Sequence, residues 1–344
     1  MKKTFAVLML FLVMTPGCSN QRSGTVSKEA TLTLGAYTVV KEVYQREIIP
    51  SFKEYWKKKT GEEVRFEESY IASGAQSRAI AGGFEADVAA LSLAKDVNRL
   101  KEAGLITHDW KANPYQGFVT RSVVVIAHRP GNPKKIRNWI DLTRREVEVL
   151  YPSPKTSGGA MWCVNAIYGA GLKLTEKDTG NPDADYARWL LKSIQKQVKV
   201  MDKSGRASVT TFENGVGDAL VTYENEAKLR QKEGKEFPFI IPDETILIEN
   251  PAALIDVNVD KHNNRRAAEA FVEFLWSERA QSAFAQYGFR PLREDVEERY
   301  AAEYPVPPHL FDIQYLGGWD EVEKNLFSQE GVWGKIVEEI ARNR

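Results

Sequence analysis

The stretch Ser-Pro-Lys-Thr-Ser-Gly-Gly-Ala-Met-Trp, residues 153–162, indicates the fold class of this chain. It follows a β-rich run that ends at Leu150, and a helical pattern begins after its two glycines. A strand, a turn of small residues and a helix, in that order, are the repeating unit of an α/β protein. Such a turn also leaves the first N–H groups of the helix without intrahelical partners, and these groups bind anions together with the helix dipole. Taken alone, however, the turn is explained as well by ordinary helix capping.

Two further turns have the same character. Residues 69–78 place Ser73 and Gly74 between a strand and an Ala-rich helical run, and residues 203–208 read Lys-Ser-Gly-Arg-Ala-Ser before a short helix. Each of the three turns follows the carboxyl end of a predicted strand. Open α/β sheets bind ligands in the crevice outside those ends. Together the turns predict an anion site built from backbone N–H groups.

Outward from these turns, short β-rich runs alternate with helical patterns, which predicts an α/β fold with mostly parallel sheets. A helix is expected over residues 43–58, and the clearest helical region is Arg265 to Tyr287, which Gly288 ends. About 310 residues follow the amino-terminal linker, more than one hydrophobic core usually serves, so two lobes are expected. The strand candidates are residues 32–34, 64–66, 87–91, 122–127, 147–150, 198–201, 219–223, 239–241 and 252–257.

The amino terminus has the pattern of a bacterial export signal. Lys2 and Lys3 precede the apolar run Phe5 to Met14, which is too short to span a bilayer. Residues 1–17 are therefore predicted to be a signal peptide, and residues 18–30 a polar tether. Cys18 stands where a lipoprotein signal places its modified cysteine, so we expect a lipid anchor on the periplasmic or extracytoplasmic face; cleavage without lipidation is the alternative.

Composition excludes several classes of partner. Without residues 1–17 the chain keeps 47 acidic residues and loses two of its 47 basic ones, for a net charge near −2. Neither nucleic acid nor an anionic membrane surface is an expected partner of such a chain. Cys163 would be the only other cysteine, so no disulfide framework is expected.

Motifs for catalysis are missing from the sequence. Gly234-Lys235 and Gly334-Lys335 are followed by Glu and Ile rather than the Ser or Thr of a phosphate-binding loop, and no Gly-x-Ser-x-Gly elbow occurs. Four histidines stand singly, without a partner at metal-ligand spacing: His108, His128, His262 and His309. We therefore predict no catalytic residue, no cofactor and no metal site.

Residues 153–162 resemble the Asn-Pro-Lys-Ser/Thr-Ser-Gly-Gly-Ala-Arg-Trp stretch of the periplasmic sulfate-binding protein family. Residues 69–78 are similar to that family's Gly-Ser-Gly-Lys-Gln-Ala-Arg-Ala, and residues 82–88 to its Gly-x-Glu-Ala-Asp-Val. Residues 217–226 resemble its Gly-Asp-Val-Leu…Trp-Glu-Asn-Glu, and residues 289–291 its Tyr-Arg-Pro. The resemblance covers about residues 32–320, nearly the whole mature chain.

This resemblance implies a two-lobed periplasmic binding protein (type II) fold that closes on a hinge over a dehydrated sulfate, with no cation touching the anion. Ser73 would donate its hydroxyl or its N–H, and Ser157, Gly158 and Gly159 would present a helix N-terminus. Gly205 would add a backbone donor. Two of the predicted anion-binding positions differ from the family: Tyr223 stands where it has a Trp donor, and Thr38 where it has an Asp that binds through its backbone.

The expected lobes are residues 30–120 with 250–290, and residues 121–249, joined by crossings near Arg121 and Asn250. Residues 291–344 would form a carboxyl-terminal segment that packs on a lobe rather than a domain.

The ligand is expected to be sulfate, which carries no proton at neutral pH, whereas hydrogen phosphate would leave its O–H unpaired among donors at a cost of about 1–3 kcal/mol. Tyr223, Thr38 and Met161, which replaces the family's Arg, leave thiosulfate, molybdate and phosphate open. The implied partner is the permease of an ABC transporter, served by a monomer. An oxyanion sensor or scaffold lipoprotein is the alternative, and an exported hydrolase is the weakest hypothesis.

Overall fold

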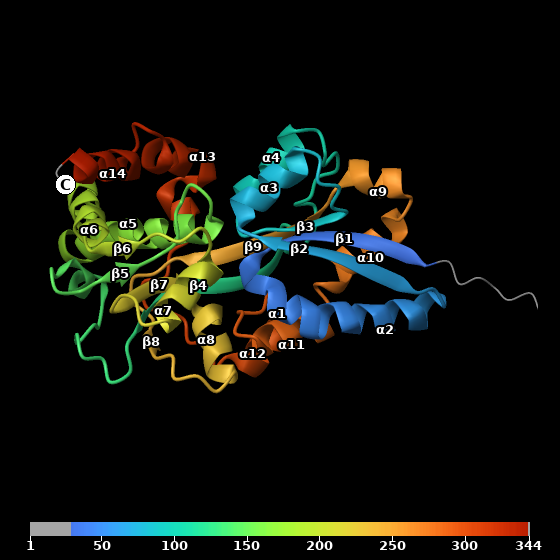
Figure 1. Ribbon diagram of the computed structural model, residues 1–344, viewed down its shortest axis with the longest axis horizontal. Coiled ribbons are helices and arrows are strands. Elements are labelled where there is room, and N and C mark those ends of the chain that lie inside the picture. The colour runs from blue at the N-terminus through green and yellow to red at the C-terminus, as the bar shows by residue number, and fades with distance from the viewer. Residues whose placement is uncertain (1–28, 343–344) are drawn as a thin grey trace, which may run out of the picture.

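The computed structural model describes residues 29–342, in which two α/β lobes share a continuous sheet of strand order β2-β1-β3-β9-β4-β7-β5-β6, with β8 on β4 (Figure 1). No helix within these residues has the length and apolar character needed to cross a membrane.

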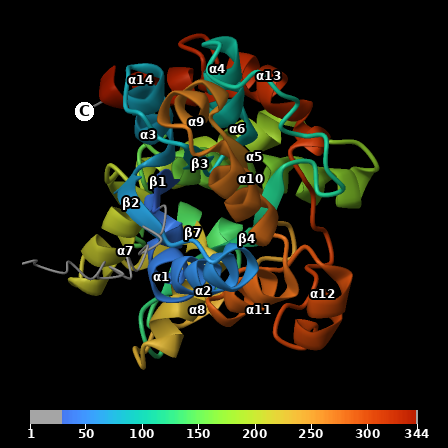
Figure 2. The same ribbon diagram turned by 90° about the vertical axis from the view of Figure 1, so that its right-hand side faces the viewer.

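The first lobe is built on three parallel strands, β1 (Ala30–Tyr37), β2 (Val64–Ile71) and β3 (Val88–Ala90). Figure 2 shows α3 and α4 on one side of these strands and α2 on the other. Against the sheet, Phe52 of α2 meets Phe271 of α10 with ring centroids 5.0 Å apart, at the centre of the apolar core. The helices of this lobe are α1 (Lys41–Val43), α2 (Ile49–Thr60), α3 (Ser73–Ala81), α4 (Ala94–Glu102), α9 (Asp256–His262), α10 (Arg265–Phe274) and α11 (Glu278–Gln286).

The second lobe is built on β7 (Ala219–Tyr223), β5 (Val149–Leu150) and β6 (Val198–Val200), which are parallel to one another. A further short strand, β8 (Phe239–Ile240), pairs with β4. The helices of the second lobe are α5 (Gly158–Thr179), α6 (Ala184–Lys196), α7 (Gly205–Glu213) and α8 (Glu224–Lys232).

Two long antiparallel strands, β4 (Phe118–His128) and β9 (Leu247–Leu254), connect the lobes. One end of β9 pairs with β3 of the first lobe, and the far half of β4 pairs with β7 of the second. Arg121 lies opposite Glu249, and Thr120 opposite Asn250, so both expected crossings fall within this strand pair. A closing motion of the lobes therefore bends β4 and β9.

The expectation of mostly parallel sheets is wrong. Four of the eight strand pairings within the described residues are antiparallel, and all four involve β4 or β9. The physical reason is the hinge: a chain that crosses to the second lobe in β4 must return in β9, in the opposite direction.

Two element boundaries also differ from the expected ones. The strand expected at residues 252–257 is β9, which begins at Leu247 and ends at Leu254, because Asp256 starts α9 and accepts the N–H of Thr107 at 2.7 Å. The helical region 265–287 is two helices, because the Ser277 hydroxyl accepts the Ala280 N–H at 3.2 Å and caps a new helix, α11.

The carboxyl-terminal chain contains α12 (Glu294–Tyr300), α13 (Gly318–Val322) and α14 (Val332–Arg342). In Figure 1, α13 and α14 lie over α5 and α6 of the second lobe. Glu339 of α14 forms ion pairs with Arg188 and Lys192 of α6. Nearer the hinge, the guanidinium of Arg290 holds the fully buried carboxylate of Glu224, at 2.7 Å from its Nε.

Candidate anion-binding site

A small cavity lies between the lobes, where the carboxyl ends of β1, β2, β3, β5 and β7 meet. The volume of this cavity is only about 10 Å³. Space of this size, about that of one water molecule, excludes an organic metabolite. Six of the seven predicted anion-binding residues line it: Thr38, Ser73, Ser157, Gly159, Gly205 and Tyr223. The other lining residues are Tyr37, Val39, Ala72, Ser92, Pro152, Cys163, Thr222 and Glu226.

Three helices begin at this cavity. The chain enters α3 at Ser73, α5 at Gly158 and α7 at Gly205, so each predicted turn does open a helix. The N–H groups of a first turn have no intrahelical acceptor, and each helix end carries a partial positive charge. The Ser157 N–H is already bonded to the Ser153 carbonyl at 2.9 Å, and its hydroxyl makes no capping bond. Ser157 can therefore serve an anion through its hydroxyl, while the glycines serve it through N–H groups.

Ser73 is restricted by its neighbours. Its hydroxyl donates to Asp96 Oδ2 at 2.6 Å and accepts the Ser92 N–H at 2.9 Å. Burial raises the pKa of the Asp96 carboxyl, although the Ser73 hydroxyl and the Arg99 guanidinium both oppose this by stabilising the carboxylate. Because the hydroxyl proton is committed to Asp96, only the N–H of Ser73 is left for a ligand. Of the two donors that the sequence allowed, the geometry favours the backbone.

Tyr223 presents its phenol to the cavity from the end of β7. Its hydroxyl lies 2.7 Å from Ser92 Oγ, and either oxygen can be the donor. Burial raises the pKa of Tyr223 well above its ordinary value, so the phenol keeps its proton at neutral pH. A neutral O–H donor thus stands where the family resemblance expected an indole N–H.

One carboxylate, that of Glu226, lines the cavity, and the predicted anion-binding residues did not include it. Glu226 is 1% exposed, and the Arg206 guanidinium holds it with an Nε to Oε2 distance of 3.1 Å. Arg206 also bonds Glu42 of the first lobe, with Nη2 to Oε2 at 2.8 Å, and so bridges the cleft. Glu226 could have been predicted from the sequence. It lies three residues after Tyr223, in the first turn of α8, and residues at this spacing lie on the same side of a helix.

Gly158 is the one predicted residue that does not line the cavity. A Cβ at this position would lie 2.9 Å from Leu93 Cγ and 2.9 Å from Ser92 Oγ, closer than a side chain permits. The glycine therefore lets α5 of one lobe pack against residues 92–93 of the other. Its structural role is close approach between the lobes.

We expect Gly158→Ala to weaken ligand binding by about 10- to 100-fold, because an overpacked contact costs roughly 1–3 kcal/mol and only the closed form contains it. Titration calorimetry measures the loss. Gly205→Ala is the matched control, because it also opens a helix at the cavity and its Cβ would meet only Val39 Cγ2, at 3.5 Å. Equal losses in the two variants would contradict the packing role of Gly158.

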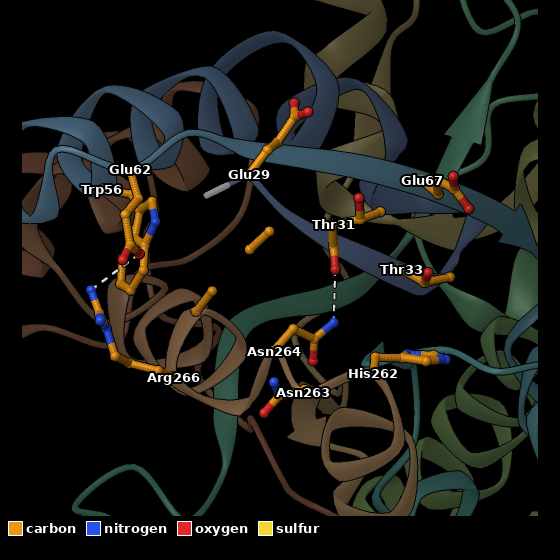
Figure 3. A pocket seen from close by; sticks show the side chains of 12 residues that line it. Glu29, Thr31, Thr33, Trp56, Glu62, Glu67, His262, Asn263, Asn264 and Arg266 are labelled. Carbon is orange, nitrogen blue, oxygen red and sulfur yellow. Dashed lines mark hydrogen bonds and ion pairs between the residues drawn. The ribbon is translucent and has the colours of Figure 1, made fainter. Parts of the chain in front are cut away.

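A wider groove of about 680 Å³ lies at the opposite end of β1 (Figure 3). Arg266 reaches Glu62 at 3.1 Å, and Asn264 Nδ2 donates to the Thr31 carbonyl at 2.7 Å. Three glutamates line this groove and none of the predicted site residues does. The groove therefore offers an anion a less favourable environment than the smaller cavity.

His262, on the rim of this groove, provides a pH dependence. Desolvation disfavours its charged form, but the hydrogen bonds that its ring donates to the carboxylates of Asp87 and Glu85 outweigh that effect and raise the pKa of His262. A raised pKa stabilises the fold below the unfolded-state pKa of about 6.5, and this contribution is lost as pH rises through the folded-state pKa. We expect the unfolding free energy to fall over that interval in the wild type. Urea titrations of His262→Gln should lack this fall; an unchanged profile would contradict it.

Comparison with known proteins supports one family. Residues 32–290 match the family described as "Bacterial extracellular solute-binding protein". The "Sulfate-binding protein" of Synechococcus elongatus is 39% identical over 339 residues, 98% of this chain and 95% of that protein. The "Thiosulfate-binding protein" of Pseudomonas aeruginosa is 32% identical over 341 residues, 98% and 99% of the two chains. The solved structure of "The sulfate-binding protein SubI from Mycobacterium tuberculosis H37Rv" is 36% identical, has a TM-score of 0.79, and covers 87% of this chain and 100% of its own. With its two lobes, its hinge strands and these matches, the chain belongs to the bacterial extracellular solute-binding protein family.

Proposed function

We propose that the protein captures sulfate between its lobes and delivers it to an ABC importer. One observation carries the proposal: the interlobe cavity is formed by three helix N-termini and neutral hydroxyl groups, and its lining contains no lysine, arginine or histidine among the described residues. Neutral donors and helix dipoles distribute the charge of a dianion over many groups. Capture of this kind needs no chemical step.

The charge arrangement favours an anion without a proton. Glu226 is the cavity's only Asp or Glu among the described residues, and its oxygens are occupied by Arg206. Hydrogen phosphate would need a free acceptor for its O–H, and leaving that O–H unpaired costs about 1–3 kcal/mol. Sulfate has no such requirement. Relatives named as sulfate-binding proteins support the same ligand.

Thiosulfate is the second candidate, because the Pseudomonas aeruginosa relative is named for it. Titration calorimetry on the mature protein with sulfate, thiosulfate, molybdate and phosphate in parallel separates the ligands. We expect sulfate to bind most tightly. Tight binding of another oxyanion without sulfate would overturn the ligand, and binding of none would overturn the site.

Delivery to a permease requires two lobes that move as units. We propose the division into residues 30–120 with 250–290 and residues 121–249, with 291–344 as a packed segment and a monomer as the working form. The β4–β9 pair supports this division. The alternative is a sensor or scaffold lipoprotein that reports the anion without transport. Deletion of the gene separates the two, because an importer component is needed for sulfate uptake and a sensor is not.

We further propose a lipid anchor at Cys18, which lies, with the signal peptide 1–17, outside the described residues. Cys18→Ala should move the protein from the membrane fraction to the soluble fraction of cells. Cys163→Ser is the control, because Cys163 is buried in α5 and cannot carry a lipid. Retention of Cys18→Ala in membranes would overturn the anchor.

A further inference from the structure

Ser92 is the point at which both lobes and the hinge meet. It follows β3 in the first lobe and is fully buried. Its N–H donates to Ser73 Oγ, and its carbonyl accepts Trp162 Nε1 of the second lobe and Asn250 Nδ2 of hinge strand β9, each at 3.0 Å. Its hydroxyl pairs with Tyr223, also of the second lobe, at 2.7 Å. Every polar atom of Ser92 therefore has a hydrogen-bond partner.

The protons of the hydroxyl pair can be counted. Ser92 Oγ and Tyr223 Oη carry one proton each, and their mutual hydrogen bond uses one of the two. Both residues line the cavity, and the neighbouring Ser73 hydroxyl already donates its hydrogen bond to Asp96. One proton of the pair thus remains for whatever occupies the cavity. Which of the two oxygens donates it depends only on the direction of the mutual bond.

We propose that Ser92 and Tyr223 form one shared donor that is completed across the cleft and gives a single O–H to the bound oxyanion. The proposal rests on the function proposed above and adds Ser92 as a binding residue that the family resemblance did not indicate. If the phenol donates to Ser92, the serine hydroxyl serves the anion; if the serine donates to Tyr223, the phenol does. The loss of either partner leaves the other free to donate.

This arrangement couples binding of the anion to closure of the lobes. Ser92 belongs to the first lobe and Tyr223 to the second, so the pair exists only while the lobes are together. An anion that accepts the remaining proton polarises the mutual bond and strengthens it. The same two hydroxyl groups therefore bind the anion and hold the closed form.

A double-mutant cycle with sodium sulfate tests the shared donor. Ser92→Ala and Tyr223→Phe each remove the mutual bond between neutral groups but keep one donor, so each should raise the Kd by about 2- to 10-fold. The double variant also loses the donor to a charged ligand and should bind about 10- to 100-fold more weakly than either single variant. Titration calorimetry supplies the Kd values, and thermal melts verify that each variant folds.

The rival explanation is that the pair only holds the lobes together. In that case each single substitution already breaks the contact, so a double variant equal to a single variant would overturn the proposal. Ser77→Ala is the matched control, because Ser77 is as fully buried and its hydroxyl donates to the Asp96 carbonyl outside the cavity; its Kd should not change. Failure of the wild type to bind sulfate would refute the proposed ligand instead, and the cycle would then be measured with the oxyanion that binds.

Discussion

Ser157→Asp is expected to abolish sulfate binding. The aspartate would place a negative charge on the cavity wall, where Ser157 now offers a neutral hydroxyl. Two unit charges 4 Å apart repel by about 4 kcal/mol at an effective dielectric constant of 20, so a dianion would face about 8 kcal/mol. That corresponds to a loss of more than about 10⁵-fold in affinity. The measurement is titration calorimetry of the folded variant.

The fold should tolerate this substitution, because Ser157 is the N-cap of α5 and Asp is as good a cap as Ser. Ser153→Asp is the matched control: it adds the same charge in the same turn, at a residue that does not line the cavity. It should weaken binding far less. If Ser157→Asp kept its affinity within tenfold of the wild type, the site would lie elsewhere.

Arg290→Met is expected to lower the unfolding free energy by about 3–5 kcal/mol, because it leaves the buried carboxylate of Glu224 without its ion-pair partner. Burial already raises the pKa of Glu224, and Arg290 is the main group that opposes this. The guanidinium also donates to the carbonyls of Tyr304 and Pro305, so the carboxyl-terminal chain loses an attachment as well. Urea unfolding provides the measurement.

Arg299→Met is the control for this loss. Arg299 pairs with Glu278 at 2.8 Å, but both side chains are about half exposed, and exposed pairs contribute about 0–1 kcal/mol. Replacing both buried partners, in Arg290→Met with Glu224→Leu, should recover part of the stability because no lone charge remains. Similar losses for Arg290→Met and Arg299→Met would show that burial of the pair is unimportant.

The residues that line the candidate anion site were predictable as far as they depend on local sequence. The turns at Ser73, Ser157 and Gly205 each combine a strand end with small residues, and such patterns are visible without a structure. The family resemblance added Thr38 and Tyr223, and both line the same cavity as the turns. Local backbone geometry determines these donors, so sequence contained the necessary information.

Features that depend on contacts across the cleft were not predictable in this way. Ser92 stands in an unremarkable Leu-Ser-Leu stretch, and its role follows only from the approach of Tyr223 from the other lobe. Arg206 and Glu42 are separated by 164 residues and meet across the cleft between the lobes. The error over parallel sheets has the same origin, because β9 pairs with strands of both lobes.

Because of the close contact at Gly158, substitutions at this position should control how far the cleft closes. Ala, Val and Leu at position 158 would act as wedges of increasing thickness against Leu93 and Ser92. The added atoms would lie between α5 of one lobe and residues 92–93 of the other, so each larger side chain would hold the cleft open by a different amount. Such a series would give a set of protein forms that differ in cleft opening, with which the opening recognised by the proposed permease partner can be measured.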